Sequence, residues 1–424
     1  MANNMTFRKI LAECCRLMLG VTFIFSGFVK AVDPMGGAIK IDDYLAAFHL
    51  SAFQSLSLIL SLNLCALEFM LGICMLLGVY RRYTSFLMLL FMAFMTPLTL
   101  YLALFNPVSD CGCFGDALVL TNWQTFWKNI ILATAAVIAF INNQRLFQCY
   151  SYKSYWFVAL FTFLFCVCFA YYNYAHLPPI DFRPYKIGAN IPKLMEMPEG
   201  APQDVYEYSF VYEKNGVKKS FGLNDYPSDD STWKFVSQEA KLIKAGYKPK
   251  IAAFNVFDDE GNDVSDTILH NSKPVLLLIA PKLEKADDSH IDEINSIYDY
   301  SVEHKIPFWC LTNSTNEEIE NWSDNTGAEY PYLMVDDVIL KTMIRSNPGL
   351  MLLRDGTILG KWHYNNIPQE EQIASFLKKD LSSNGGKRKE DSYLLFNLLS
   401  FSLPLLAVWN YDYFRNRRRT KKTA

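Results

Sequence analysis

Six long apolar runs restrict what this chain can fold into more than any other feature. Each is close to the ~20 residues that an α-helix needs to cross a bilayer. The runs cover residues 9–29, 55–79, 83–105, 124–141, 155–175 and 393–411. Charged residues make up 20% of the chain, below the roughly 25% that is usual in soluble domains. We therefore expect a multi-pass protein embedded in a lipid bilayer, and the net charge of −3 gives no sign of a nucleic-acid partner.

Basic residues in the connecting segments predict the orientation of these spans. Such residues concentrate in cytoplasmic loops. If the six spans alternate, one side receives Arg8, Lys9, Arg81, Arg82, Arg145, Lys153 and the basic tail 413–424. The tail outweighs the opposing "KRK" at 387–389. We expect both termini in the cytoplasm of a bacterium and residues 176–391 on the periplasmic side of the inner (cell) membrane.

The segment before the last span carries the pattern of an α/β domain. Continuous apolar runs, typical of buried strands, occur in "KPVLLLIA" and "IPFWCLT", and "IAAFNVF" (251–257) predicts a further strand. Amphipathic helices are expected at 287–304 and 315–327. "SNPGLMLLRDGTILGKW" predicts a turn and a hairpin, and "PQEEQIASFLKK" a closing helix. Upstream, "DVYEYSFVYEKNGVKKSFGL" predicts another hairpin that turns at residues 215–216.

This order of elements resembles a thioredoxin-like domain. The resemblance implies a cis-proline before the hairpin, which is Pro348 here, and a redox Cys-x-x-Cys after the first buried strand. The matching segment, "APKLEKADD" (280–288), contains no cysteine. Disulfide exchange needs a thiolate, and Cys310 is no substitute because its strand is predicted to be buried. We expect a thioredoxin-like domain that has lost its own dithiol chemistry.

The loop "DCGCFGD" (110–116), between the third and fourth runs, is the candidate redox site. A disulfide between Cys111 and Cys113 would close a small ring that departs from relaxed geometry, and strained, exposed disulfides are labile and oxidising. Gly112 would give the backbone the freedom that closure needs. Asp110 and Asp116 should raise thiol pKa values, or else cap helices or bind a partner.

Other interpretations of this loop stay open. A structural zinc site needs about four ligands, and no histidine or third cysteine is near in sequence; we therefore expect no metal. A structural disulfide would constrain little chain, and free, inert thiols are a further alternative. Cys166 and Cys168 do not supply a second pair, because residues i and i+2 of a helix point to nearly opposite sides.

Ionisable residues in and after the first two runs carry a second resemblance. "SGFVKAVDP" contains Lys30 and Asp33, and "LEFMLG" places Glu68 within a span. A charge there costs a few kcal/mol, so Glu68 should face the bundle interior and find a partner. With the cysteine loop, these motifs make residues 8–145 similar to the DoxX-like superfamily and, within it, to the MauE-type redox-associated membrane proteins. The resemblance implies a four-helix bundle linked to thiol–disulfide chemistry.

The expected fold is an α-helical integral membrane bundle with a periplasmic α/β thioredoxin-like domain and a C-terminal transmembrane helix. The expected parts are a DoxX/MauE-like bundle (1–145), a fifth span (146–176), a linker and hairpin region (177–246), the thioredoxin-like domain (247–380), a sixth span (391–412) and a basic tail (413–424).

We expect a membrane protein linked to periplasmic thiol–disulfide chemistry, and a candidate thiol–disulfide oxidoreductase, in which Cys111 and Cys113 form the redox pair. The α/β domain would bind a periplasmic thiol or disulfide protein. The supporting residues would be Lys30, Asp33, Glu68, Asp110, Asp116 and Pro348. The alternatives are a non-catalytic scaffold or assembly factor and a small-solute transporter. No cofactor is required by the sequence, and a quinone is one option.

Overall fold

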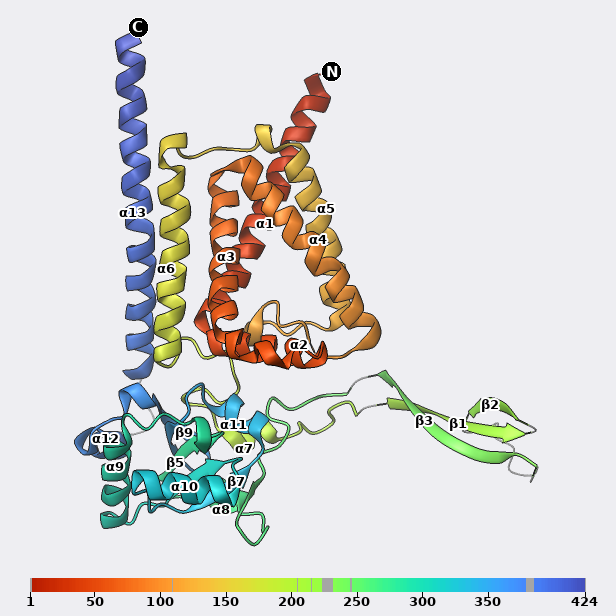
Figure 1. Ribbon diagram of the computed structural model, residues 1–424, viewed down its shortest axis with the longest axis vertical. Coiled ribbons are helices and arrows are strands. Elements are labelled where there is room, and N and C mark those ends of the chain that lie inside the picture. Colours follow the sequence, from red (N-terminus) through yellow and green to blue (C-terminus); the bar gives the residue numbers. More distant parts are fainter. Residues whose placement is uncertain are drawn as a thin grey trace.

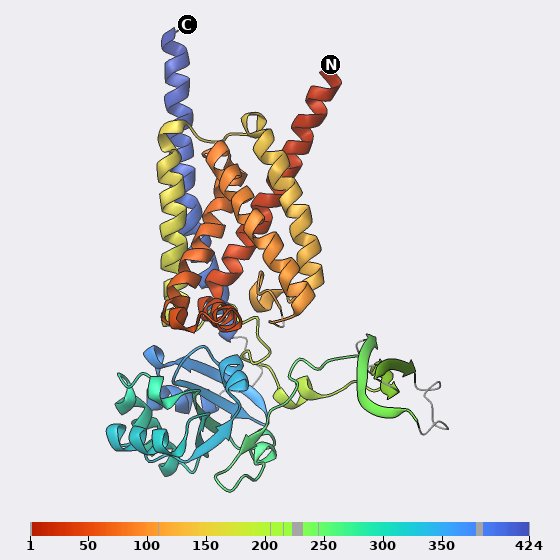
Figure 2. The ribbon, with the colours of Figure 1, turned by 45° about the vertical axis from the view of Figure 1, so that its right-hand side comes forward.

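The computed structural model describes residues 2–108, 110–203, 205–214, 216–222, 232–244, 246–378 and 385–423. Figure 1 shows three bodies: a bundle of long helices, an α/β domain beneath one end of it, and a small sheet to the side. The second view in Figure 2 confirms that the α/β domain lies under the bundle and that the small sheet projects away from both.

Within the described residues, six helices are long and apolar enough to span a membrane. They are α1 (Ala2–Val32), α3 (Ser57–Leu77), α4 (Arg81–Phe105), α5 (Asn122–Ile141), α6 (Tyr155–Ala175) and α13 (Gly385–Thr423). All six predicted apolar runs are therefore confirmed as helices. The protein is a multi-pass membrane protein by these spans, with five in the N-terminal bundle and α13 beside α6.

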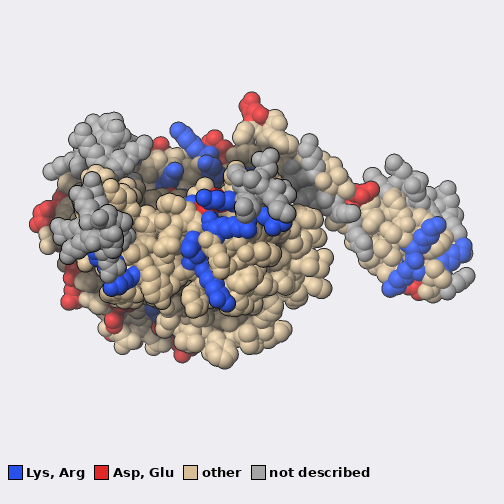
Figure 3. Space-filling view, turned by 90° about the horizontal axis from the view of Figure 1, so that it is seen from above, with Lys and Arg blue, Asp and Glu red and all other residues tan. Residues whose placement is uncertain are grey.

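Both ends of the chain lie at the end of the bundle away from the α/β domain (Figure 1). The α3–α4 and α5–α6 connections, with the basic residues 81–82 and 145, are at this same end. Figure 3 looks onto it and shows Lys and Arg gathered over its centre. The basic connections therefore share one side of the bundle, as the alternation of spans predicts. The side chains of the basic tail after residue 415 lie outside the described residues.

Helices α1 and α3 pack closely because glycines remove side chains from their contact. A Cβ on Gly27 would lie 2.5 Å from the Phe69 backbone nitrogen and 2.7 Å from the Cys65 carbonyl oxygen. A Cβ on Gly72 would lie 2.6 Å from the Ile24 backbone nitrogen. Small residues of this kind let transmembrane helices approach backbone to backbone.

A further helix, α2 (Pro34–Ala47), crosses the base of the bundle on the side of the α/β domain (Figure 1). Its N-cap is Asp33, whose Oδ1 accepts a hydrogen bond from the Gly36 amide at 2.9 Å. Proline follows at the first helical position, where its missing N–H costs nothing. This helix is not among those expected from the sequence, although Asp-Pro is a recognisable start signal.

The α/β domain contains a six-stranded sheet in the order β4-β7-β6-β5-β8-β9. Strands β5, β6 and β7 are parallel, and β8 and β9 form an antiparallel hairpin beside β5. The strands are β4 (Val256–Phe257), β5 (Val275–Ala280), β6 (Phe308–Thr312), β7 (Tyr332–Val335), β8 (Gly349–Arg354) and β9 (Thr357–His363). The helices of this part are α7 (Ile191–Met195), α8 (Ser265–Leu269), α9 (Ile291–Glu303), α10 (Asn316–Thr326), α11 (Asp337–Met343) and α12 (Glu370–Lys378).

The order β9-β8-β5-β6, with α9 between β5 and β6 and α12 after β9, is the arrangement expected of a thioredoxin-like domain. The peptide bond between Asn347 and Pro348 is cis. The prediction for "IAAFNVF" was wrong in extent, because only Val256 and Phe257 form a strand. Strand β7 and helix α11 were not predicted; β7 has just four residues.

Each face of this sheet has its own core. Alternate residues of β5 and β8, such as Leu277 and Met351, pack with α8 and α11 on one face. Leu276 and Leu350 pack on the other face, with α9, α12 and Trp322 of α10. Continuous apolar strands are expected where both faces are covered, and β5 is buried at every position.

The small sheet has three strands in the order β2-β1-β3. They are β1 (Val205–Lys214), β2 (Val217–Gly222) and β3 (Lys234–Lys244). The predicted hairpin is confirmed by the antiparallel register of β1 and β2. Gly216 is in the left-handed region at φ 79°, as its turn requires, whereas residue 215 lies outside the described residues.

We expect Gly27→Leu to separate α1 from α3, because the added side chain meets backbone atoms that cannot move aside. Overpacking of this kind costs roughly 1–3 kcal/mol or more. The measurement is the midpoint of heat-induced loss of monodisperse protein in detergent, which should fall by about 5 °C. Val21→Leu, at an exposed position of the same helix, is the control. An equal midpoint for both variants would contradict the close helix contact.

Candidate functional site

The cysteine loop joins α4 to α5 at the end of the bundle that faces the α/β domain. The side-chain nitrogen of Asn122, the first residue of α5, donates to Asn106 Oδ1 at 2.8 Å and to the Val108 carbonyl at 3.0 Å. These bonds tie the two ends of the loop together. Gly112 and Gly115 have φ of 65° and 50°, a region that favours glycine.

The two thiols of the loop face each other. Cys111 Sγ and Cys113 Sγ lie 2.8 Å apart as a hydrogen-bonded pair. Cys111 is buried, whereas Cys113 is partly exposed. The Tyr44 hydroxyl of α2 donates to the Cys111 carbonyl oxygen at 3.0 Å. The structure therefore brings the predicted pair together and makes its members unequal.

A buried ion pair lies under the loop, inside the bundle. Lys30 Nζ of α1 donates to both carboxylate oxygens of Glu68 on α3, at 2.7 and 2.8 Å. The Ser26 hydroxyl, one turn before Lys30, is 2.8 Å from Glu68 Oε2 and 2.7 Å from the Cys113 carbonyl oxygen. The expected partner of Glu68 is thus Lys30, and Ser26 connects the pair to the cysteine loop.

The surroundings push the two thiol pKa values apart. The hydrogen bond from Cys111, followed by the positive charges of Lys128 and Lys30, lowers the pKa of Cys113 to about 6. The same hydrogen bond, together with burial, raises the pKa of Cys111. Because Glu68 largely neutralises Lys30, Lys128 of α5 supplies most of the net positive charge. Its Nζ lies 4.3 Å from the centre of the Phe114 ring. At neutral pH, Cys113 is the thiolate and Cys111 the thiol.

The two aspartates of the loop form ion pairs with basic side chains. Asp110 Oδ2 accepts from Lys40 Nζ of α2 at 2.8 Å, and its Oδ1 accepts from the Gly112 amide at 2.9 Å. Asp116 pairs with Arg345 of the α/β domain at 3.3 Å. Burial raises the pKa of Asp116, and Arg345 opposes that shift. These contacts agree with a positioning role for the aspartates rather than a direct effect on the thiols.

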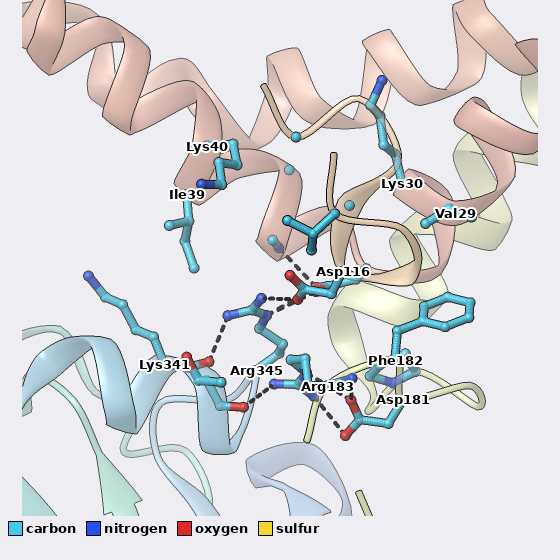
Figure 4. Close-up of a pocket in the computed structure, with 18 of the residues that line it drawn as sticks. Val29, Lys30, Ile39, Lys40, Asp116, Asp181, Phe182, Arg183, Lys341 and Arg345 are labelled. Carbon is cyan, nitrogen blue, oxygen red and sulfur yellow. Dashed lines mark hydrogen bonds and ion pairs between the residues drawn. The ribbon is translucent and has the colours of Figure 1, made fainter. Parts of the chain in front are cut away.

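Arg345 connects the α/β domain to the cysteine loop (Figure 4). Its guanidinium binds Asp33, the cap of α2, at 3.1 Å as well as Asp116. It lies between α11 and the cis-proline at 348. The loop before Pro348 is also joined to the segment that lacks the cysteines, since the Asn347 side chain donates to the Lys282 carbonyl at 2.8 Å. Arg345, three residues before the cis-proline, therefore joins this part of the domain to the cysteine loop at Asp116.

A cleft of about 560 Å³ separates the cysteine loop from the α/β domain. Figure 4 shows side chains from α1, α2, the loop, the 180–184 segment and α11 converging on it. Gly112 and Gly115 line it on the membrane side, and Lys341 and Arg345 on the domain side. A volume of this size is in the range of small-molecule and peptide side-chain sites.

The segment that leaves α6 holds the domain in this position. Asp181 accepts hydrogen bonds from Lys361 Nζ of β9 at 2.8 Å and from Arg183 Nε at 2.8 Å. The Asn365 side chain donates to the carbonyl of Ala175, the last residue of α6, at 2.8 Å. Burial lowers the pKa of Lys361 to about 8, but Asp181 supports its charge.

Sequence reasoning found both cysteines, Lys30, Asp33, Glu68, both loop aspartates and Pro348. It missed the residues that connect them, namely Ser26, Lys40, Tyr44, Lys128 and Arg345. Lys128 could have been recognised from the sequence, because a lysine within an apolar span is costly and therefore marks a candidate functional residue. Arg345 carried none, because it approaches the loop from more than 200 positions later in the chain. Within the described part of the chain, no cluster of three or more His, Cys, Asp or Glu side chains is arranged to hold a metal ion.

Comparison with known families identifies the membrane bundle. A family profile described as "Methylamine utilisation protein MauE" matches residues 8–142. These residues form a MauE-family region. The match covers α1 to α5 and includes the cysteine loop, which confirms the predicted resemblance. A second profile, "Domain of unknown function (DUF8463)", matches residues 206–245, which include most of the three-stranded sheet.

The domain that follows the MauE-family region is similar to a solved structure. A solution structure described as a "putative protein disulfide isomerase from Bacteroides thetaiotaomicron" is 18% identical, covering 30% of this chain and 86% of that one, with a TM-score of 0.25. The thioredoxin-like assignment here depends instead on the strand order of the domain itself. Comparison with curated proteins gives no match.

We expect Cys113 to react with iodoacetamide with a midpoint near its pKa of about 6. Below that pH most of Cys113 is protonated and unreactive, and above it most of Cys113 is thiolate. Cys111 should stay unreactive through neutral pH. Lys128→Gln removes a nearby positive charge and should raise the midpoint by about one pH unit. Mass spectrometry of alkylated peptides from the reduced full chain measures both. Lys153→Gln, in an exposed connection, is the control; a Cys113 midpoint near 9 would contradict this electrostatic account.

We expect Arg345→Met to loosen the domain from the cysteine loop. Hydrogen bonds to charged groups contribute about 1.5–3 kcal/mol, so backbone amide exchange in 110–116 should rise by roughly tenfold. Hydrogen–deuterium exchange of the full chain in nanodiscs measures this. Lys341→Met is the matched control, because its ion pair to Asp337 is confined to α11. Equal exchange in the two variants would show that Arg345 does not hold the loop.

Proposed function

We propose that this protein is a membrane thiol–disulfide exchange protein with Cys111 and Cys113 as its redox pair. The observation that carries the proposal is the unequal thiol pair, 2.8 Å apart, beside a cleft shared with a thioredoxin-like domain. The MauE-family match of the bundle supports the same class of chemistry. In this proposal, Lys30, Asp33, Glu68, Asp110, Asp116 and Pro348 have supporting rather than chemical roles.

Cys113 is the attacking sulfur in this mechanism. Its thiolate attacks one sulfur of a partner disulfide, an S–S bond forms between the two proteins, and the partner's other sulfur leaves as a thiolate. Cys111 gives its proton to the first partner thiolate and attacks Cys113, so that the Cys111–Cys113 disulfide forms and the second partner thiolate leaves. Two electrons pass from the pair to the partner. The reverse sequence oxidises a partner dithiol, and the relative potentials set the direction.

Lys128 and the group formed by Ser26, Glu68 and Lys30 would support this chemistry from inside the bundle. Lys128 stabilises the thiolate of Cys113. The Ser26 hydroxyl lies 2.7 Å from the Cys113 carbonyl oxygen and would help to position the backbone of the loop there. The charged atoms of Lys30 and Glu68 are hydrogen-bonded to each other and to Ser26. In this proposal the ion pair therefore positions the loop and takes no part in the chemistry.

The α/β domain would present the partner. It has no cysteine in the segment 280–288, so it cannot exchange disulfides there. Arg345, three residues before the cis-proline, lines the cleft and pairs with Asp116 of the cysteine loop. We propose that a partner segment enters this cleft and meets Cys113. The location that suits this chemistry is the periplasmic face of a bacterial inner membrane, where disulfides persist, with both termini in the cytoplasm.

We expect Cys111→Ser to accumulate a stable mixed disulfide between Cys113 and glutathione, because the resolving thiol is gone. Cys113→Ser should form the corresponding adduct on Cys111 more slowly by roughly tenfold or more, since Cys111 stays protonated and buried. The measurement is intact mass of the full chain in nanodiscs after exposure to oxidised glutathione. Cys168→Ser, at an exposed position on α6, is the control.

A glutathione titration of the unaltered chain separates this function from its main alternative. Reversible interconversion of the dithiol and the Cys111–Cys113 disulfide supports exchange. A pair that stays reduced or stays oxidised throughout would move the assignment to a non-catalytic scaffold. In a scaffold, the domain would bind its partner equally well with both cysteines replaced.

A further inference from the structure

The three-stranded sheet lies beside the membrane and takes no part in the proposed exchange. Figures 1 and 2 show it to one side of the α/β domain, just beyond the level at which the bundle ends. Helices α4 and α5 form the side of the bundle that is turned towards it (Figure 1). A bilayer that surrounds these spans would therefore extend sideways over the sheet.

Aromatic residues at the domain-side ends of α4 and α5 indicate where that bilayer has its surface. Tryptophan and tyrosine, whose rings are amphipathic, concentrate at membrane–water interfaces. Helix α4 ends here with Phe105, and α5 begins here with Trp123 and Trp127; all three side chains are largely exposed. Lipid can therefore contact the bundle down to this level, which is close to the level of the sheet in Figures 1 and 2.

Lysine side chains lie on the surface of the sheet that is turned towards the bilayer. Figure 3 looks down from the end of the bundle away from the α/β domain, so it shows this surface of the projecting sheet, with blue side chains on it. The three strands contain no arginine. The lysines whose side chains are described there are Lys214, Lys218, Lys219 and Lys234.

Strand pairing gathers these four lysines at one end of the sheet, which we call the hairpin end. Lys214 is the last residue of β1, and Lys218 and Lys219 lie directly after the turn, opposite Glu213 and Tyr212. Lys234, the first residue of β3, also lies opposite Glu213. Among the side chains described in the three strands, the acidic ones are Glu207 and Glu213. The hairpin end is therefore positively charged, and an anionic partner is favoured.

Aromatic side chains accompany the lysines at the hairpin end. Lys214 Nζ lies 5.8 Å from the centre of the Trp233 ring, and Lys219 Nζ lies 5.2 Å from that of Phe221. Phe235, which packs on Tyr212, is largely exposed. Lysine together with tryptophan and tyrosine is the combination that anchors proteins at a membrane interface, where one end of each side chain is apolar and the other polar.

We propose that the hairpin end binds the anionic phospholipid headgroups of the membrane that holds the bundle. The lysine ammonium groups would donate to phosphate oxygens, and the aromatic rings would lie in the interfacial layer. An acidic soluble protein would satisfy the same charges, but the position of the sheet beside the bilayer favours lipid. This contact would fix the direction in which the sheet projects. It uses none of the residues of the exchange reaction, so either proposal can fail without the other.

Photo-crosslinking of the full chain in nanodiscs tests the contact. Val217→p-benzoylphenylalanine places a photoreactive group on β2, opposite Lys214 and next to Lys218. We expect mass spectrometry to find phosphatidylglycerol on the peptide that contains residue 217. Val302→p-benzoylphenylalanine, at a similarly exposed position of α9, is the control and should give little lipid adduct. Equal yields at the two positions would overturn the proposal.

Replacement of two lysines tests the headgroup charge. Each lysine near an anionic membrane surface favours binding by roughly fivefold. Lys218→Gln combined with Lys219→Gln should therefore lower the adduct yield at position 217 by about tenfold or more. Lys273→Gln combined with Lys305→Gln removes the same charge from exposed positions of the α/β domain and should leave the yield unchanged. Amide exchange in β1 shows whether the sheet stays folded in both variants.

A lipid and salt series on the chain with all its lysines tests the same charge without altering the sheet. The yield at position 217 should fall when phosphatidylcholine replaces phosphatidylglycerol, and also at high salt, which screens exposed charges. A yield that is independent of lipid charge and of salt would overturn the proposal. Adducts to a second copy of this chain, in vesicles that hold many copies, in place of lipid adducts would overturn it as well.

Discussion

The buried ion pair between Lys30 and Glu68 is the interaction on which the rest of this site depends. Neither charge is tolerable alone within a bilayer, where an unpaired ionisable group costs several kcal/mol. Their pairing fixes the rotation of α1 against α3, and glycine at position 27 lets the two backbones approach closely enough to form it. Ser26 extends the pair to the Cys113 carbonyl. A structural requirement inside the membrane thereby sets the position of a thiol at its surface.

The difference between the two loop thiols follows from this placement. Both belong to one three-residue segment, but Cys111 is buried, whereas Cys113 is partly exposed and lines a small cavity beside Lys30, Glu68 and Lys128. The hydrogen bond from Cys111 and the charge of Lys128 favour a thiolate at Cys113. A pair with one nucleophile and one resolving thiol is what directional exchange requires, and an isolated Cys-Gly-Cys peptide would not have it.

The α/β domain has no cysteine at 280–288, so in the proposed function it would act through its position. Asp181 and Lys361 attach the exit segment of α6 to the sheet, while Arg345 attaches the proline region to α2 and the cysteine loop. These two attachments leave a cleft between the bodies rather than a sealed interface. A domain without a dithiol then lies where a partner would be held against the membrane thiols.

Some features of this protein depend only on local composition and on the periodicity of apolar residues. The six spans, the buried strands β5 and β6 and the missing dithiol at 280–288 could all be predicted, because bilayer thickness and strand burial act on contiguous residues. The sequence also indicated that Cys111, Cys113 and Glu68 are candidate functional residues. Which residues meet depends on the tertiary structure: Lys30 with Glu68, Lys128 with Phe114 of the cysteine loop, and Arg345 with Asp33. Such contacts join segments tens to hundreds of residues apart. They depend on helix rotation and domain placement, which no local pattern encodes.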